Sequence, residues 1–160
     1  MQLRLILTGP KGQLIPINYQ YPLSACIYKI IERADAAYSL FLHNQGHHAN
    51  ARLKAFKLFT FSNLSMPCKR VDDRLQIEGN RAEMQIAFHI PETAEKFVIG
   101  IFKDQQVEIA DRYSKASFTV SGVEVLPGLI TKTNIPDEMM QATLHPLSPV
   151  VIGHKNERGH

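Results

Sequence analysis

The chain has 160 residues, of which 44% are hydrophobic and 21% charged. This composition is typical of a globular domain and excludes a wholly disordered chain. The formal net charge of +3 is mildly basic, which is compatible with a nucleic-acid partner but does not identify one. The longest apolar run, 97–102, is far too short to span a bilayer, and the two cysteines form no CxxC motif. We therefore expect a cytoplasmic protein with reduced cysteines and no membrane association.

The first part of the chain predicts a strand followed by a helix. Residues 2–8 alternate between apolar and polar side chains, which is typical of a strand. A helix is expected to follow Pro22, because proline suits the first turn. The apolar residues of this helix form one stripe: Leu23, Ile27, Ile30, Ile31 and Ala34. Tyr28 lies roughly 125° from the centre of that stripe, so we expect it outside the core, as a rim residue or a functional one.

A second helical segment, 36–43, is predicted after Asp35, which can cap its N-terminus. We expect its buried face to consist of three residues: Ala37, Leu40 and Phe41. His43 lies off that face in the last turn, a position that is typical of a surface residue as well as of a functional one. His43 and His47 have a spacing that can bind zinc on a helix, but Gly46 separates them and no Cys, Asp or Glu is nearby. We therefore predict no metal and no other cofactor.

The next strand, 55–62, contains a lysine in an unusual position. Lys57 shares a face with Phe59 and Phe61 in the alternating pattern. Because an unpaired buried charge is unfavourable, we expect Lys57 at an exposed end of the strand or beside a partner.

The mixed-charge segment 63–80 predicts a solvated hairpin. Its basic residues, and those that precede the strand at 55–62, are candidates for contacts with a nucleic-acid backbone. These candidates are Arg52, Lys54, Lys69, Arg70 and Arg74.

The remaining elements complete a recognisable order. A strand at 81–89 precedes a helix that begins near Pro91, and strands at 106–110 and 116–126 follow. A bulge at Ser121–Gly122 explains why alternation shifts within the last strand. The order predicts an α+β, ferredoxin-like βαββαβ (RRM-like) domain, with a four-stranded antiparallel sheet and two helices on one face. This topology has many functions and does not assign one.

The domain boundary is expected near residue 126. We expect residues 1–126 to form the ferredoxin-like domain, and 127–160 to be a linker and the first strand of a truncated second domain. Residues 129–160 are too few to build a second core of their own.

Several short segments, taken in chain order, carry a family resemblance. They are Pro16-Ile17-Asn18-Tyr19, Tyr21-Pro22-Leu23, Ile27-Tyr28, Phe41-Leu42-His43, Lys57-Leu58-Phe59-Thr60-Phe61-Ser62, Thr143-Leu144 and Leu147-Ser148-Pro149-Val150-Val151. This series resembles the N-terminal half of the CRISPR-associated repeat-processing endoribonucleases of the RAMP superfamily. The family's glycine-rich loop and second domain are not found in this sequence, so we expect the isolated chain to cleave weakly.

The resemblance implies a metal-independent endoribonuclease that cuts CRISPR precursor RNA within its repeats and releases guide RNAs for antiviral defence. It implies three catalytic residues: Tyr28, His43 and Lys57. Attack by the RNA 2′-hydroxyl would give a 2′,3′-cyclic phosphate. This reaction needs a base, an acid and a cation beside the phosphate. Tyr28 and His43 would share the roles of base and acid, in an order that the sequence leaves open, and Lys57 would stabilise the developing charge.

Two other functions are compatible with the same sequence. The chain is alternatively a non-catalytic module that binds repeat RNA, or a ferredoxin-like protein-interaction domain. CRISPR repeat RNA is the expected partner, and a CRISPR effector complex and a second copy of the chain are further candidates.

Overall fold

The structure is a computed structural model that describes residues 1–44 and 59–127. These residues belong to a compact unit, Met1–Leu129. Some predictions fall outside the described residues: Lys57, Arg52, Lys54 and nearly all of the expected segment 127–160. Within the described part of the chain, no helix combines the length and the apolar character needed to cross a lipid bilayer.

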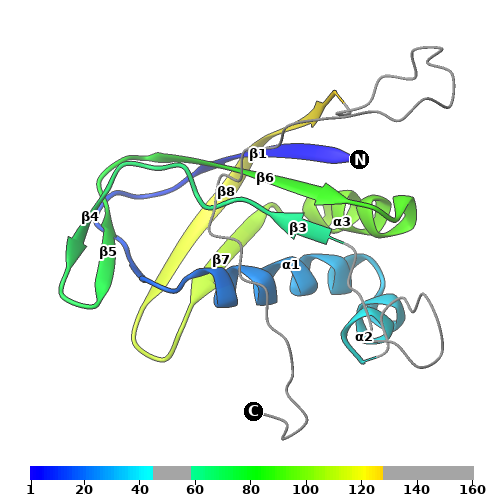
Figure 1. Cartoon of the computed structure of the whole chain (residues 1–160), viewed down its shortest axis with the longest axis horizontal. Helices are drawn as coiled ribbons and strands as arrows, with labels where there is room; N and C mark the ends of the chain where they lie inside the picture. Colours follow the sequence, from blue (N-terminus) through cyan, green and yellow to red (C-terminus); the bar gives the residue numbers. More distant parts are fainter. Residues whose placement is uncertain (45–58, 128–160) are drawn as a thin grey trace, which may run out of the picture. The chain divides into compact units, whose positions relative to one another are not determined.

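The main sheet is antiparallel and has five strands in the order β3-β6-β1-β8-β7 (Figure 1). They are β3 (Phe59–Phe61), β6 (Arg81–Phe88), β1 (Gln2–Thr8), β8 (Lys115–Leu126) and β7 (Gln106–Ala110). The prediction of a four-stranded sheet is therefore wrong. Strands were predicted at both 106–110 and 116–126, but the four-stranded βαββαβ order counts only one strand after the last helix. Both belong to the sheet, because β7 and β8 are joined by a short turn and pair with each other as a hairpin.

The expected bulge in β8 is confirmed. Strand β1 pairs with β8 through Leu7 and Val120 on one side of the irregularity, and through Ile6 and Gly122 on the other. Ser121 is the additional residue, so the pleat of β8 stays in phase with β1 on both sides of it.

A smaller sheet has the order β2-β5-β4. Strand β2 (Leu14–Pro16) pairs with β5 (Arg74–Ile77), which forms a hairpin with β4 (Cys68–Val71). The hairpin predicted within 63–80 is therefore confirmed. Asp72 in its turn has φ of 53°, a left-handed conformation that aspartate tolerates better than most residues.

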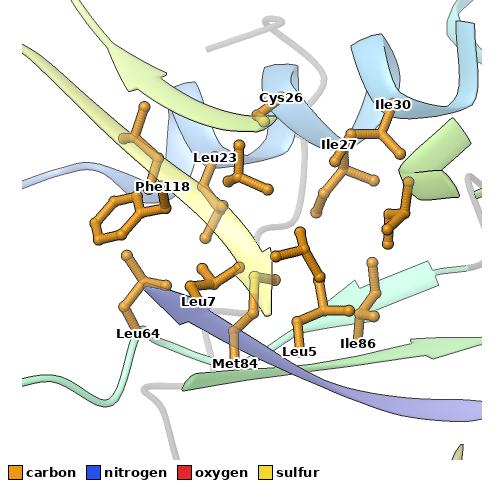
Figure 2. Close-up of a cluster of buried hydrophobic side chains, with 14 of the residues drawn as sticks. Leu5, Leu7, Leu23, Cys26, Ile27, Ile30, Leu64, Met84, Ile86 and Phe118 are labelled. Atoms are coloured by element: carbon orange, nitrogen blue, oxygen red, sulfur yellow. The ribbon is translucent and has the colours of Figure 1, made fainter. Parts of the chain in front are cut away.

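Three helices are present among the described residues. The predicted ferredoxin-like fold counted two, and the helical segment predicted at 36–43 is the third. They are α1 (Gln20–Ala34), α2 (Ala36–Asn44) and α3 (Pro91–Lys103). The predicted apolar stripe of α1 is buried except for Ala34, which is partly exposed. Its side chains pack against the buried leucines of β1 and against β6 and β8, as Figure 2 shows. This single apolar cluster is the core of the unit.

Helices α1 and α3 contact each other closely where α3 has a glycine. A Cβ atom placed on Gly100 would lie 1.8 Å from the carbonyl oxygen of Ile30, so only glycine fits at this contact. The ends of the two helices cap each other. Arg33 of α1 donates to the carbonyl oxygen of Asp104 at 2.9 Å, and Lys103 of α3 donates to that of Arg33 at 2.8 Å. The orientation of α1 is therefore fixed by α3 and the sheet.

Candidate functional site

Three elements meet at the side chain of Tyr28. The Tyr28 ring, on α1, lies edge-on to the ring of His43 from α2, with 5.7 Å between centroids and 76° between planes. It also contacts Phe59, the first residue of β3, at 5.6 Å and 70°. Tyr28 is partly buried against the core, and His43 is exposed. The structure thus brings together two of the three residues that the sequence proposed as catalytic.

The aromatic contacts continue from the site into the core. Phe59 contacts Phe88 of β6 at 6.0 Å, and Phe88 contacts Phe97 of α3 at 5.1 Å. Phe97 is fully buried. The face of Tyr28 that turns inward is therefore backed by packed rings, which restricts the positions that its own ring can take.

Lys57 was the third predicted catalytic residue, and it lies outside the described residues. The described chain resumes at Phe59, two positions later in the sequence. The chain that leaves β3 is tied to the start of α1 by two hydrogen bonds. The backbone N–H of Leu64 donates to the buried phenol of Tyr19 at 2.9 Å, and Gln20 donates to Asn63 at 2.9 Å. Burial raises the pKa of the Tyr19 phenol.

Helix α2 is held in place by polar bonds at its N-terminus. As the sequence predicted, Asp35 caps it, because its carboxylate accepts the backbone N–H of Tyr38 at 2.9 Å. Lys96 of α3 forms an ion pair with the same carboxylate at 3.0 Å. The hydrogen bond from Tyr38 and the nearby Lys96 lower the pKa of Asp35, so the carboxylate stays charged at neutral pH.

The predicted buried face of α2 is wrong for two of its three residues, and the correction explains where His43 lies. Ala37 and Leu40 are exposed and Phe41 is half-buried against the core, whereas Ser39 and Leu42 are buried. The Ser39 hydroxyl donates to the carbonyl oxygen of Tyr28 at 3.2 Å. Since residues four apart lie on one face of a helix, this bond turns His43 towards α1.

A second contact with α3 supports the same orientation of α2. The hydroxyls of Tyr38 and Thr93 are 2.6 Å apart, and Thr93 is fully buried. Burial raises the pKa of the Tyr38 phenol, so this hydroxyl keeps its proton and the hydrogen bond is retained over the physiological pH range.

Two hollows of about 200 Å³ each adjoin the Tyr28–His43 pair. Besides the pair, the first is lined by Tyr21, Ser24 and Ala25 of α1. The second is lined, besides the pair, by Lys29, Glu32, Ala36, Ser39 and Leu40. The pair therefore stands between two spaces, each large enough for a small part of a ligand.

The imidazole of His43 is oriented by its neighbour. The ring Nδ1 lies 3.0 Å from the side-chain oxygen of Asn44. Because an amide oxygen only accepts, Nδ1 carries the proton in this arrangement, and in the neutral ring Nε2 is left to accept one. The pair thus places a phenol beside an imidazole whose Nε2 can accept a proton. Among the residues that the structure describes, no three His, Cys, Asp or Glu side chains lie close enough to hold a metal ion.

The predicted RNA-contacting residues that the structure describes lie on the β4–β5 hairpin, which Figure 1 shows well away from α2. Strand β4, with Lys69 and Arg70, is exposed throughout. Lys69 forms an ion pair with Glu78 at 3.2 Å. Arg74 differs in its burial, because its side chain is only 12% exposed where it forms an ion pair with Asp111 at 2.5 Å. This pairing raises the pKa of Arg74 and lowers that of Asp111. Arg74 therefore also joins the hairpin to the β7–β8 turn.

Sequence reasoning missed two residues that shape this site, Ser39 and Tyr21. Each carries a positional signal: Ser39 precedes His43 by four residues, and Tyr21 precedes Tyr28 by seven. Both intervals place side chains on one helical face. The signals become informative only once the contact between α1 and α2 is known.

The described residues thus form a mixed α/β domain with an antiparallel sheet, three helices and an aromatic–imidazole pair where two helices meet. Residues 14–124 match the family model of CRISPR-associated protein Cas6, N-terminal. The chain belongs to this family, and the resemblance found in its sequence is confirmed.

Known relatives are longer than this chain. It is 33% identical over 129 residues to the CRISPR-associated endoribonuclease Cas6 1 of Methanocaldococcus jannaschii, a match that covers 79% of this chain and 46% of the relative. This chain therefore spans about half the length of the curated relative that it matches. A solved structure of a CRISPR associated protein Cas6 shares 29% identity, with a TM-score of 0.57, over 83% of this chain and 50% of that one.

Two further solved structures share the fold at lower identity. One comes from a study of a Cas6-related gene from Pyrococcus furiosus, with a TM-score of 0.63 and 20% identity over 80% of this chain and 48% of that one. The other is described as a RAMP protein binding different RNA substrates, with a TM-score of 0.60 and 17% identity over 79% of this chain and 48% of that one.

Proposed function

We propose that this chain carries the catalytic residues of an endoribonuclease that cleaves CRISPR precursor RNA within its repeats and releases guide RNAs. The observation that carries this proposal is the contact between Tyr28 and His43, with centroids 5.7 Å apart beside two hollows. A curated relative is named as an endoribonuclease, which supports the class of reaction.

The proposed reaction needs no nucleophile from the protein, because RNA supplies its own 2′-hydroxyl. The Nε2 atom of His43 takes the proton from this hydroxyl, and its oxygen then attacks the adjacent phosphorus. The bond to the 5′-oxygen breaks, and the Tyr28 phenol gives that oxygen a proton. The products are a 2′,3′-cyclic phosphate and a 5′-hydroxyl. Side chains alone perform these steps in this proposal, without a metal or another cofactor.

Lys57 is proposed to stabilise the negative charge that develops on the phosphate. Its assignment rests on the family resemblance and on its place in the sequence, two residues before Phe59, whose ring contacts Tyr28. A lysine is suited to this role as a compact positive charge on a long side chain.

We also propose that basic residues outside the catalytic pair bind the RNA backbone. Lys69 and Arg70 lie on the fully exposed strand β4, which supports them as contacts. Arg74 stays a candidate, and its RNA contact would be made in addition to its ion pair with Asp111. Arg52 and Lys54 stay predictions from the sequence, as do a CRISPR effector complex, a homodimer, a cytoplasmic location and the boundary at residue 126.

The architecture is proposed to be ferredoxin-like. The strands in the order β3-β6-β1-β8, together with the crossovers through α1 and α3, correspond to a βαββαβ unit. In this proposal β7 is an additional edge strand, and β2, β4 and β5 form an inserted small sheet.

A cleavage assay in EDTA tests the function. The 160-residue chain, in excess over a CRISPR repeat RNA, is expected to cut one position and leave a 2′,3′-cyclic phosphate. A single 2′-deoxy substitution at the nucleotide before the cut should abolish cleavage, and the same substitution elsewhere should not. RNA that is bound but stays intact would identify the non-catalytic alternative and contradict the proposal.

A further inference from the structure

The outward face of α1 carries a second tyrosine in line with Tyr28. Tyr21, Ser24, Ala25 and Tyr28 follow the i, i+3, i+4, i+7 spacing that places side chains on one face of a helix. All four line the same hollow, together with His43. On this face the side chains between the two tyrosines, Ser24 and Ala25, are small. The bottom of the hollow is therefore lined by small side chains, and an aromatic ring lies at each end.

The ring of Tyr21 is available for stacking on a ligand, whereas the ring of Tyr28 is packed against its neighbours. Tyr21 is 84% exposed, whereas the Tyr28 ring is packed edge-on between His43 and Phe59. Seven residues at about 1.5 Å each separate the two tyrosines by about 10 Å along the helix axis. The solvent-exposed ring of Tyr21 therefore lies close, along α1, to the Tyr28–His43 pair that is proposed to act on the phosphate.

We propose that Tyr21 stacks on the base of a nucleotide that flanks the cleaved phosphate, and so positions single-stranded RNA in the site. This inference rests on the proposed function and adds a residue that binds the substrate without taking part in the proton transfers. Aromatic side chains hold unpaired RNA bases by stacking, and they accept every base because each has a π face.

The size of the hollow supports a single nucleotide as its occupant. At about 200 Å³ it is smaller than the roughly 300–1,000 Å³ of pockets that enclose drug-sized ligands. One base or sugar fits such a space. The second hollow, on the Lys29 side of the pair, leaves room for the chain to continue past the phosphate.

Binding of a non-cleavable RNA tests this inference separately from catalysis. The probe is the repeat RNA with 2′-deoxy at the nucleotide before the cut, prepared with and without the base at each of the two flanking nucleotides. Tyr21→Ala should weaken binding of the complete RNA by about 5-fold to 150-fold. At one flanking position, removing the base should weaken binding to the wild-type chain but not to Tyr21→Ala, because both changes remove the same contact.

Two matched variants separate stacking from general effects. Tyr21→Phe keeps the ring and should bind as the wild type does. Phe102→Ala removes another exposed aromatic side chain, 70% exposed on α3, and should also leave binding unchanged. In cleavage, Tyr21→Ala should raise KM while kcat changes little, as expected for a group that binds substrate and transition state alike.

Unchanged RNA binding by Tyr21→Ala would overturn this inference. It would also be overturned if removing the base and removing the Tyr21 side chain weakened binding additively at both flanking positions. If the wild-type chain binds the RNA through Tyr21 but cleaves none, the proposed function fails, and of this inference only the stacking of Tyr21 on an RNA base stands.

Discussion

Helix α1 has two helical neighbours, and its contacts with them differ in kind. Against α3 the backbones touch, since a Cβ atom on Gly100 would lie 1.8 Å from the oxygen of Ile30. Against α2 the contact is made by a side-chain hydrogen bond from Ser39 and by rings 5.7 Å apart. Hollows of about 200 Å³ remain on this second side.

This difference separates a rigid side of α1, which holds Tyr28 in position, from an open side, where the proposed chemistry would take place. The close α1–α3 contact and the buried core fix the position of Tyr28. Helix α2 is held by hydrogen bonds of Asp35 and Ser39 and by the buried side chain of Leu42, whereas His43 in its last turn is exposed. A rigid element that carries one catalytic group beside an accessible space is a general requirement of active sites.

The largest effect on stability is expected from adding a methyl group to the α1–α3 contact. In a helix without this contact, Gly100→Ala would stabilise the protein by up to about 1 kcal/mol through helix propensity. Here the added Cβ meets the backbone of Ile30, so we expect a lower free energy of unfolding, by about 1–3 kcal/mol. Urea denaturation measures this change.

Gly122→Ala is the matched control for the previous substitution. Its Cβ would lie 3.3 Å from Cδ1 of Ile6, the far end of a flexible side chain. We expect its unfolding free energy to fall by at most about 1 kcal/mol. If Gly100→Ala is as stable as Gly122→Ala or more so, the two helices are not in backbone contact.

A smaller effect is expected on the α2 side, from the charge of Asp35. Asp35→Asn keeps an oxygen that can cap α2 but loses the ion pair with Lys96. Because the folded pKa of Asp35 is lowered, its charge stabilises the protein fully above the unfolded value of about 3.9. This contribution is lost as the pH falls through the folded pKa.

Thermal unfolding at two pH values measures this contribution. The wild-type chain should have a higher Tm than Asp35→Asn at pH 7, and the difference should shrink towards pH 3. A difference that stays constant between these pH values would show that the charge of Asp35 does not hold α2.

The smallest effect is expected on the β4–β5 hairpin, away from α1. Replacing both Lys69 and Arg70 by alanine should reduce the salt dependence of RNA binding. The slope of log K against log salt should fall by about 0.7 for each phosphate contact that is lost. Lys115→Ala, which removes a basic residue paired with Glu108, is the control. An unchanged slope in the double variant would remove the hairpin from the RNA-binding surface.

Most elements of the fold were predictable because their patterns are local. The alternation in β1, the cap at Asp35 and the bulge at Ser121 each follow from a few neighbouring residues, and the structure confirms them. The number of strands in the sheet was not predictable in this way. It depends on β7 pairing with β8, and the order of elements alone does not show that pairing.

The candidate site was predictable only in part. Tyr28 and His43 were noticed separately because they avoid the apolar faces, and the family resemblance alone joined them. The face of α2 was wrongly predicted because a short helix with scattered apolar residues has no strong stripe. Its rotation is set by bonds from Tyr38 and Ser39 to residues of the two neighbouring helices, Thr93 of α3 and Tyr28 of α1, and Leu40 is left exposed.

The central claim is that Tyr28 and His43 act together on one phosphate, and a double-mutant cycle on RNA cleavage tests it most directly. Tyr28→Phe and His43→Ala should each lower the single-turnover rate by roughly 10²–10⁴-fold. The double variant should be little slower than the slower single variant, because groups that act as a unit are not additive. Wild-type rates in both single variants would contradict the claim.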